Sequence, residues 1–209
     1  IGAIFGGRYL RDDDGAISLD ANGFPLVNPE DGVIGDPNPD FTYGVNFGAN
    51  YRNFDLQFAF TGQAGNQIFN YIGVYHLQGM RRPFNHTTQV LDRWRENGDV
   101  TDVPRATQDD SNLNTRVSDR YIESGSFMRM RNITLGYTLP MANENSMIKR
   151  LRVYLTGENI FTLTSYSGFD PEISAIDPNN DQNYNMFQGI DTGQFPQPRR
   201  FFAGVQVTF

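Results

Sequence analysis

The segment from Phe41 to Tyr51 alternates between apolar and polar or small residues, and this pattern constrains the fold most strongly. Its odd-numbered positions carry Phe, Tyr, Val, Phe, Ala and Tyr, with Thr, Gly, Asn, Gly and Asn between them. A period of two predicts a β-strand with one apolar face. The run is longer than an ordinary strand of about five or six residues, and it matches the roughly 9 to 11 residues that cross a bilayer at a tilt.

Further segments repeat this alternation along the chain. A second run begins at Phe54, directly after Arg52 and Asn53, and two residues between two alternating runs predict a tight hairpin. Arg-Asn is not the preferred Asn-Gly pair, so the extent of this turn stays open. A weaker strand is expected over residues 1–10, and the clear runs cover residues 54–62, 127–139, 151–161 and 201–209.

The connections between these runs alternate between short and long. The connections after Tyr51 and Leu139 are short, whereas residues 11–40, 63–126 and 162–199 form long ones. Outer-membrane barrels have short periplasmic turns and longer extracellular loops. We therefore predict an all-β protein, a transmembrane antiparallel β-barrel in the outer membrane with long extracellular loops. The five or six strands cannot close such a barrel, so the remaining strands are expected from sequence outside this chain.

Composition agrees with strands and excludes several classes of protein. The chain has 17 Phe, 10 Tyr and 21 Gly, and no apolar stretch reaches the roughly 18 residues of a transmembrane helix. A net charge of −7 argues against nucleic acid as a partner, because phosphate binding requires a basic surface. The absence of cysteine excludes disulfides and thiolate metal sites.

Enzymatic and metal-binding sites find little support in the sequence. His76 and His86 lack a third ligand in register, so we predict no zinc site. The acidic turn Asp20–Gly23 lacks the ligand spacing of a calcium loop. The remaining candidates are carboxylates that could form a glycosidase-like pair, but a structural role is favoured for them, namely Glu158, Asp170 and Glu172. We therefore expect no enzyme and no cofactor.

Four stretches resemble one family in its own order. They are Gly35–Asn70, Ser126–Pro140, Leu151–Ile173 and Phe195–Phe209. Together they resemble the C-terminal end of SusC-like and RagA-like, TonB-linked outer-membrane transporters of the Bacteroidota. Residues 1–34 match less well.

This resemblance implies that residues 1–209 are the C-terminal part of a 22-stranded barrel, with the plug domain and earlier strands outside this chain. It implies nutrient uptake, of oligosaccharides or peptides, energised by the TonB complex. It also implies a SusD-like surface lipoprotein as partner. Alternation alone does not identify lipid on the apolar face, so a secreted all-β domain for glycan binding or adhesion remains the alternative.

Two sets of residues are candidates for function. An alternating run that ends in an aromatic residue resembles the signal that barrel-assembly machinery recognises. The physical basis for such recognition is that an unpaired edge strand can template pairing with another sheet. That run consists of Phe201, Ala203, Val205, Val207 and Phe209. Aromatic and amide residues of the last long loop are candidates for substrate contact, namely Tyr166, Asn179, Asn180, Tyr184 and Gln188.

Three further features require an explanation. Arg129 and Arg131 share the parity of the apolar face, so they either meet lipid phosphates near the outer interface or are turned inward by a local bulge. The segment Thr88–Gly98 is expected to form a short helix that ends at Gly98. Its Trp94, the one tryptophan of the chain, is interpreted as an anchor that holds the long loop together.

Overall fold

The computed structural model describes residues 3–74, 85–101, 103–107, 114–140, 147–173 and 188–209. The chain divides into two compact units, each built from three segments. We call them the sheet unit and the loop unit. The sheet unit comprises Asp40–Ala64, Ser126–Ser165 and Pro196–Phe209, and the loop unit comprises Ile1–Pro39, Gly65–Gly125 and Tyr166–Phe195.

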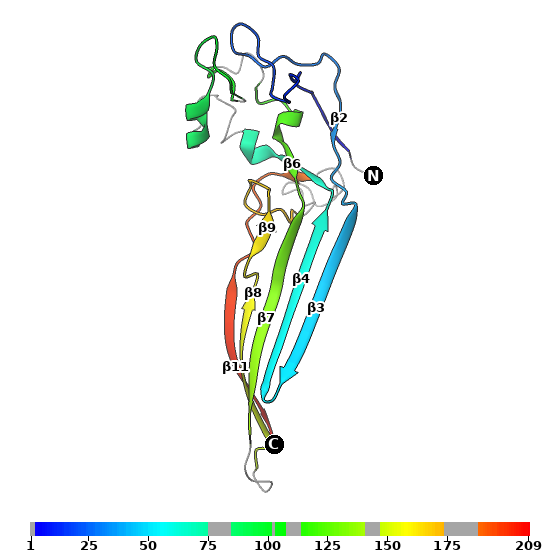
Figure 1. Cartoon of the computed structure of the whole chain (residues 1–209), viewed down its shortest axis with the longest axis vertical. Helices are drawn as coiled ribbons and strands as arrows, with labels where there is room; N and C mark the ends of the chain where they lie inside the picture. The colour runs from blue at the N-terminus through cyan, green and yellow to red at the C-terminus, as the bar shows by residue number, and fades with distance from the viewer. Residues whose placement is uncertain (1–2, 75–84, 102, 108–113, 141–146, 174–187) are drawn as a thin grey trace. The chain divides into compact units, whose positions relative to one another are not determined.

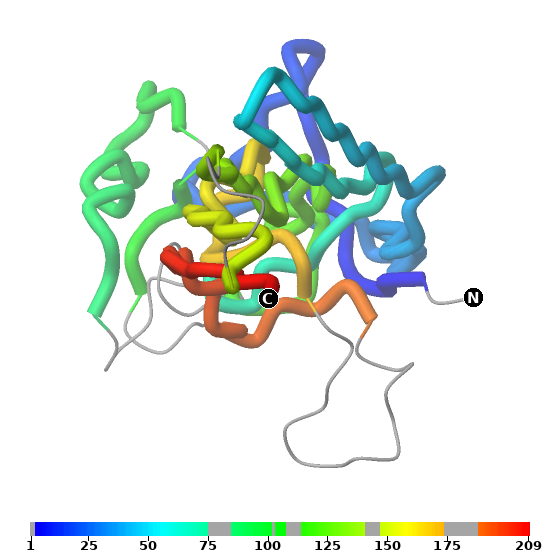
Figure 2. Tube along the Cα trace, turned by 90° about the horizontal axis from the view of Figure 1, so that it is seen from below, coloured from blue at the N-terminus to red at the C-terminus, as the bar shows by residue number. Residues whose placement is uncertain are grey.

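The sheet unit is an antiparallel sheet with the strand order β11-β8-β7-β4-β3 (Figure 1). The alternating runs form these strands, and the predicted all-β barrel class is confirmed. Within the described residues β3 and β11 are the two edges of the sheet, and Figure 2 follows it from the blue β3 to the red β11. The strands are β3 (Phe41–Tyr51), β4 (Phe54–Ala64), β7 (Phe127–Leu139), β8 (Arg150–Glu158) and β11 (Arg200–Thr208), and β9 (Thr162–Thr164) pairs with β7.

The predicted hairpin is a two-residue turn. Arg52 and Asn53 separate β3 from β4, and Tyr51 pairs with Phe54. Arg52 has φ 55°, a left-handed conformation that usually favours Gly or Asn. The neighbouring strand supports this turn, since the Thr138 amide donates to the Asn53 carbonyl oxygen at 2.8 Å.

A β-bulge interrupts the pairing of β4 with β7. Ala59 pairs with Asn132 and Phe60 pairs with Met130, so Arg131 is an extra residue in β7. A second irregularity follows on the other side of β7, where β8 ends at Glu158 and Asn159 has φ 51°. The predicted continuous strand over 151–161 is therefore wrong beyond Glu158.

The loop unit has strands and a core of its own. β10 (Ile190–Asp191) runs parallel to β5 (Gln67–Asn70), which pairs antiparallel with β6 (Ile122–Ser124). β1 (Ile4–Gly6) and β2 (Gly32–Gly35) form a separate antiparallel pair. The buried core consists of Ile4, Phe69, Val74 and Tyr121. The segments predicted only as long connections thus fold around a common core.

Two local predictions for this unit are corrected. Of the expected strand over 1–10, the structure forms only β1, because a bulge and isolated bridges interrupt the pairing. Instead of a helix over Thr88–Gly98 there is a 3₁₀ helix, η2 (Thr88–Asp92), after which Arg93 is extended. η2 has no side-chain N-cap bond and no acidic residue in its first turn, which removes two usual stabilisers of a helix start.

The anchoring role of Trp94 is confirmed. Its side chain is buried, and its indole lies so close to Gly23 that a Cβ there would meet it at 2.1 Å. The Trp94 amide donates to the Val103 carbonyl, and the Arg105 amide donates to the Gly23 carbonyl. Two loop segments distant in sequence are thereby joined. A second 3₁₀ helix, η3 (Asp119–Tyr121), contributes Tyr121 to the core. No helix among the described residues is long and apolar enough to cross a membrane.

Candidate functional site

Apolar side chains of the sheet unit fall in register on one face. The cross-strand row through the middle of the sheet is Ala49, Leu56, Leu135, Leu155 and Ala203. Aromatic pairs flank this row, with ring centroids 4.9 Å apart for Phe47 and Phe58 and 4.7 Å apart for Phe54 and Tyr137. Phe47, Phe54 and Leu155 are nevertheless exposed. An exposed apolar face of this extent marks an interaction surface, either for lipid or for another protein layer.

The hydroxyl of Tyr43, on this face, is hydrogen-bonded within the sheet unit. Tyr43 lies over Gly62, where a Cβ would come within 2.5 Å of the Tyr43 Oη. The Tyr43 hydroxyl donates to the Phe127 carbonyl oxygen at 3.2 Å. Because Gly62 has no side chain, the ring can fold flat and place its polar atom on the backbone.

The opposite face carries polar side chains that contact one another. Arg152 Nε donates to Asp55 Oδ1 at 2.9 Å, and the pair crosses β7 at Gly136. A Cβ on Gly136 would come within 2.4 Å of both side chains. The Arg152 guanidinium also lies 5.0 Å from the Tyr154 ring centroid. The two faces of the sheet therefore differ as the alternation predicts, one apolar and one hydrogen-bonded.

The bulge in β7 decides where Arg129 and Arg131 lie. Arg131 Nε donates to Thr61 Oγ1 at 2.6 Å, and Thr61 shares the polar face with Asp55. Beyond the bulge Arg129 pairs with Thr61, and its Nε donates to Thr162 Oγ1 at 2.9 Å. Arg129 is only 2% exposed. The bulge therefore turns both arginines onto the polar face, which agrees with the predicted alternative of a local bulge.

The predicted C-terminal run forms the edge strand β11 and the residue after it. Its members Ala203, Val205 and Val207 pair with Leu155, Val153 and Leu151 of β8 on the apolar face. Phe201 and Phe209 are 75% and 77% exposed. Within the described residues no strand pairs with the other side of β11. The run thus presents both a free backbone edge and an apolar face.

The loop unit contains a cavity of about 420 Å³. Asn70, at the end of β5, is fully buried beside it, whereas Thr87, Ser167 and Phe169 are exposed along its rim. Among the described residues, its lining comprises Asn70, Ile72, Thr87, Ser167, Gly168, Phe169, Thr192 and Gly193.

Glu123 of β6 fixes one wall of this cavity. Its Oε1 accepts hydrogen bonds from Asn70 Nδ2 at 2.9 Å and from Ser167 Oγ at 2.7 Å. Its Oε2 accepts the Ser167 amide at 2.8 Å. One carboxylate therefore ties β6 to the end of β5 and to the segment that leads to Phe169.

Asp191 of β10 fixes the other wall. Its Oδ2 accepts the Tyr166 hydroxyl at 2.6 Å, and its Oδ1 accepts the Gly193 amide at 2.8 Å. Asp191 is 1% exposed. Burial, together with the bond to Asp191, raises the pKa of Tyr166 well above its usual range. The Tyr166 hydroxyl therefore remains protonated and holds the wall in place.

The five candidates for substrate contact are only partly described. Tyr166 supports a wall of the cavity, and Gln188 Nε2 donates to Asn38 Oδ1 at 3.3 Å. Asn179, Asn180 and Tyr184 lie outside the described residues. Asn70 and Glu123 were missed in the sequence because a single amide or carboxylate in a long connection carries no local signal. Phe169 belongs to the stretch Leu151–Ile173 that resembles the family, and nothing in the sequence singled it out as a candidate.

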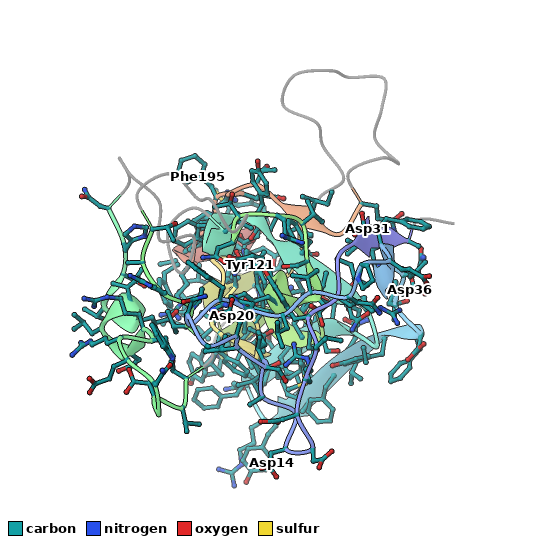
Figure 3. All side chains as sticks on the ribbon, turned by 90° about the horizontal axis from the view of Figure 1, so that it is seen from above. Asp14, Asp20, Asp31, Asp36, Tyr121 and Phe195 are labelled. Carbon is teal, nitrogen blue, oxygen red and sulfur yellow. The ribbon has the colours of Figure 1, made fainter. Side chains whose placement is uncertain are left out.

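The acidic segment before β3 uses its side chains for turns. Oxygens at positions 12, 20, 28 and 36 each accept the amide two residues ahead, and the residues concerned are Asp12, Asp20, Asn28 and Asp36. The hydrogen bond from the Asn38 amide lowers the pKa of Asp36. Figure 3 shows Asp14, Asp20, Asp31 and Asp36 spread apart within the loop unit. The described residues contain no group of three acidic or His side chains that could hold a metal ion.

The remaining enzymatic candidates have structural contacts. Glu158 forms an ion pair with Arg200 at 3.8 Å, within the sheet unit. Asp170, in the loop unit, accepts the Glu172 amide at 2.9 Å. His86 is partly buried, and His76 lies outside the described residues.

Several known proteins are similar to this chain in sequence, although no family model matches it. TonB-dependent receptor P3 of Formosa agariphila is 34% identical over 192 residues, which cover 91% of this chain and 18% of that protein. TonB-dependent receptor P26 of the same organism is 34% identical over 205 residues, covering 96% and 20%. TonB-dependent receptor SusC of Bacteroides thetaiotaomicron is 25% identical over 194 residues, covering 91% and 17%. The chain therefore spans about one fifth of the length of these relatives.

Solved structures agree with the sequence relatives. The structure of the RagAB peptide importer in its closed-closed state matches 98% of this chain and 23% of its own chain, with a TM-score of 0.74 and 24% identity. The open-open state matches with a TM-score of 0.73 and 23% identity. At this identity the likeness shows the fold. Sequence and fold together show that the chain belongs to the TonB-dependent receptors and has the fold of one part of a transmembrane β-barrel.

Proposed function

We propose that this chain is the C-terminal barrel wall, with extracellular loops, of an outer-membrane importer of oligosaccharides or peptides. The observation that carries the proposal is the two-faced sheet. One face is continuously apolar and exposed, and the other carries the Asp55–Arg152 pair and the inward-turned Arg129 and Arg131. Barrel strands that face lipid outside and an aqueous lumen inside have this alternation. The relatives named as TonB-dependent receptors support it.

The proposed orientation places the β3–β4 turn in the periplasm and the loop unit outside the cell. The two-residue turn and the longer segments of the loop unit match the short periplasmic turns and long extracellular loops of such barrels. In this arrangement β11 runs toward the periplasm and ends beside Phe209.

The proposed partners follow from the relatives and from β11. The TonB complex would energise import through the plug domain, which lies with the earlier strands outside this chain. A SusD-like surface lipoprotein would cover the extracellular side. The barrel-assembly machinery would bind the free edge of β11. It would recognise the side chains of Phe201, Ala203, Val205, Val207 and Phe209.

The proposed substrate route runs along the long connection over residues 162–199. Tyr166 and Gln188 are described there, and Asn179, Asn180 and Tyr184 belong to the same long connection. A substrate on this route would meet hydroxyl, amide and aromatic side chains, which are the groups that orient small ligands in pockets.

Uptake by living cells tests the proposal. The gene is deleted in the source bacterium, and accumulation of labelled oligosaccharides and labelled peptides is compared with that of the parent strain. We expect accumulation of one substrate class to fall and to return when the intact gene is restored. A protein recovered entirely in the soluble fraction, with unchanged accumulation of both classes, would contradict the proposal.

The assembly signal is tested separately by exchanging the terminal aromatic residue. Phe209→Ser should lower the amount of protein in the outer membrane, whereas Thr208→Ser, on the neighbouring position of the same edge, should not. Equal amounts of the parent protein and both variants in the outer membrane would show that the assembly machinery does not recognise Phe209.

A further inference from the structure

The cavity of the loop unit has the size of a small-ligand site. Its volume of about 420 Å³ lies within the range of roughly 300 to 1,000 Å³ that is usual for such pockets. The lining combines apolar and hydroxyl-bearing residues, and both walls are fixed by carboxylates that do not belong to the lining. Because a site of this kind is preformed, less binding free energy is spent on ordering its side chains when a ligand binds.

We infer that this cavity binds a neutral sugar ring, with its apolar face on Phe169 and its hydroxyls on the polar rim. The inference rests on the proposed import function and names a substrate class for it. The site unites Phe169, Ser167 and Thr192 from the connection over residues 162–199 with Thr87 from the connection over residues 63–126, all within the loop unit.

The lining favours a neutral ligand over a charged one. None of the described residues that line the cavity carries a charge. Glu123 and Asp191 stand behind the walls, and their oxygens accept hydrogen bonds from the protein itself. Against these described lining residues, a charged ligand group would lose hydration without gaining an ionic partner, which is unfavourable.

Phe169 supplies an apolar surface beside these polar groups. Its side chain is 66% exposed at the rim of the cavity, although an aromatic ring gains free energy when it leaves water. A sugar ring presents C–H groups on its faces and hydroxyls around its edge. The exposed ring and the surrounding hydroxyls of the cavity match these two kinds of surface.

The polar groups of the rim can both donate and accept. Thr87 is the N-cap residue of η2, yet its side chain makes no capping hydrogen bond. Its hydroxyl is therefore not required by the helix. Hydroxyls such as those of Thr87 and Thr192 each offer one donor and two acceptor sites, as do the hydroxyls of a sugar.

Binding is measured with the full-length natural protein in detergent, by calorimetric titration. The probes are neutral hexasaccharides of glucose, mannose, xylose and galactose, and a tryptic digest of casein represents peptides. We expect at least one hexasaccharide to bind, and Phe169→Ala to weaken its affinity roughly tenfold through the loss of ring contact. Thr87→Val should weaken it severalfold.

Phe195 provides the matched control. It belongs to the same unit, is 91% exposed and does not line the cavity, and it is labelled in Figure 3. Phe195→Ala should leave the affinity unchanged, and both Phe variants should keep the melting temperature of the parent protein.

Three results would overturn the inference. They are binding of peptides instead of sugars, failure of every hexasaccharide to bind, and an equal loss of affinity in the Phe169 and Phe195 variants. In each of these cases, reduced uptake by the deletion strain would still support the import proposal. Unchanged uptake in the deletion strain, in contrast, contradicts import itself.

Discussion

Replacing Phe47 by Arg tests whether the apolar face lies in hydrocarbon. Phe47 is near the middle of β3, is 49% exposed and stacks on Phe58 at 4.9 Å. An Arg at the bilayer midplane destabilises a barrel by about 2–4 kcal/mol. Lost burial of the ring adds about 1.5–3 kcal/mol, and the lost aromatic pair adds about 0.5–1.5 kcal/mol. The expected total is about 4–8.5 kcal/mol.

Asn46→Arg is the control, because Asn46 is the preceding residue of β3 and points to the polar face. It should change the free energy of unfolding by less than about 1 kcal/mol, as exposed substitutions usually do. The assay is urea unfolding of the natural protein in phospholipid bilayers. The folded fraction is measured from its heat-modifiable migration on a gel. If Phe47→Arg lowered the free energy of unfolding by less than about 1.5 kcal/mol, loss of the Phe47–Phe58 contact alone would explain the change. The Phe47 ring would then not lie in lipid.

Three other predictions concern single contacts. Gly136→Ala should destabilise the natural protein in urea by about 1–3 kcal/mol, because the new Cβ would displace Arg152 from its carboxylate partner; an unchanged midpoint would contradict this. Gly23→Ala should shift the fluorescence of Trp94 to longer wavelength, because the indole can no longer lie against the turn, and an unshifted spectrum would show that this contact is absent. Because burial raises the pKa of Tyr166 in the folded state, its contribution to stability should be present below about pH 10 and be lost as the pH rises further. Urea midpoints measured across that range check this, and Tyr166→Phe should reduce the pH dependence.

The strands of the sheet unit could be predicted because each carries its signal locally. β3 and β7 have the predicted bounds, and both faces follow from the alternation. The bulge at Arg131 could not be predicted, since an inserted residue becomes visible only against the register of β4. The sequence therefore left two alternatives for Arg129 and Arg131, and only the pairing decided between them.

The loop unit was largely hidden in the sequence. β5 has four residues and β10 has two, which is too short for a periodic signal. Their pairing joins residues near position 70 with residues near 190, so no local pattern indicates it. Glu123 and Ser167 lie 44 positions apart, so no local pattern indicates their hydrogen bond either.

The aqueous or lipid environment of each face can be measured residue by residue. The printed sequence has no cysteine, so single cysteines placed from Val45 to Ala49 can be spin-labelled selectively, provided the rest of the natural protein also lacks accessible thiols. In bilayers we predict that collisions with oxygen, which concentrates in hydrocarbon, peak at positions 45, 47 and 49 and that collisions with a water-soluble nickel complex peak at 46 and 48. Labels at 45, 47 and 49 that meet the nickel complex freely, or that neither reagent reaches, would contradict a lipid-facing sheet.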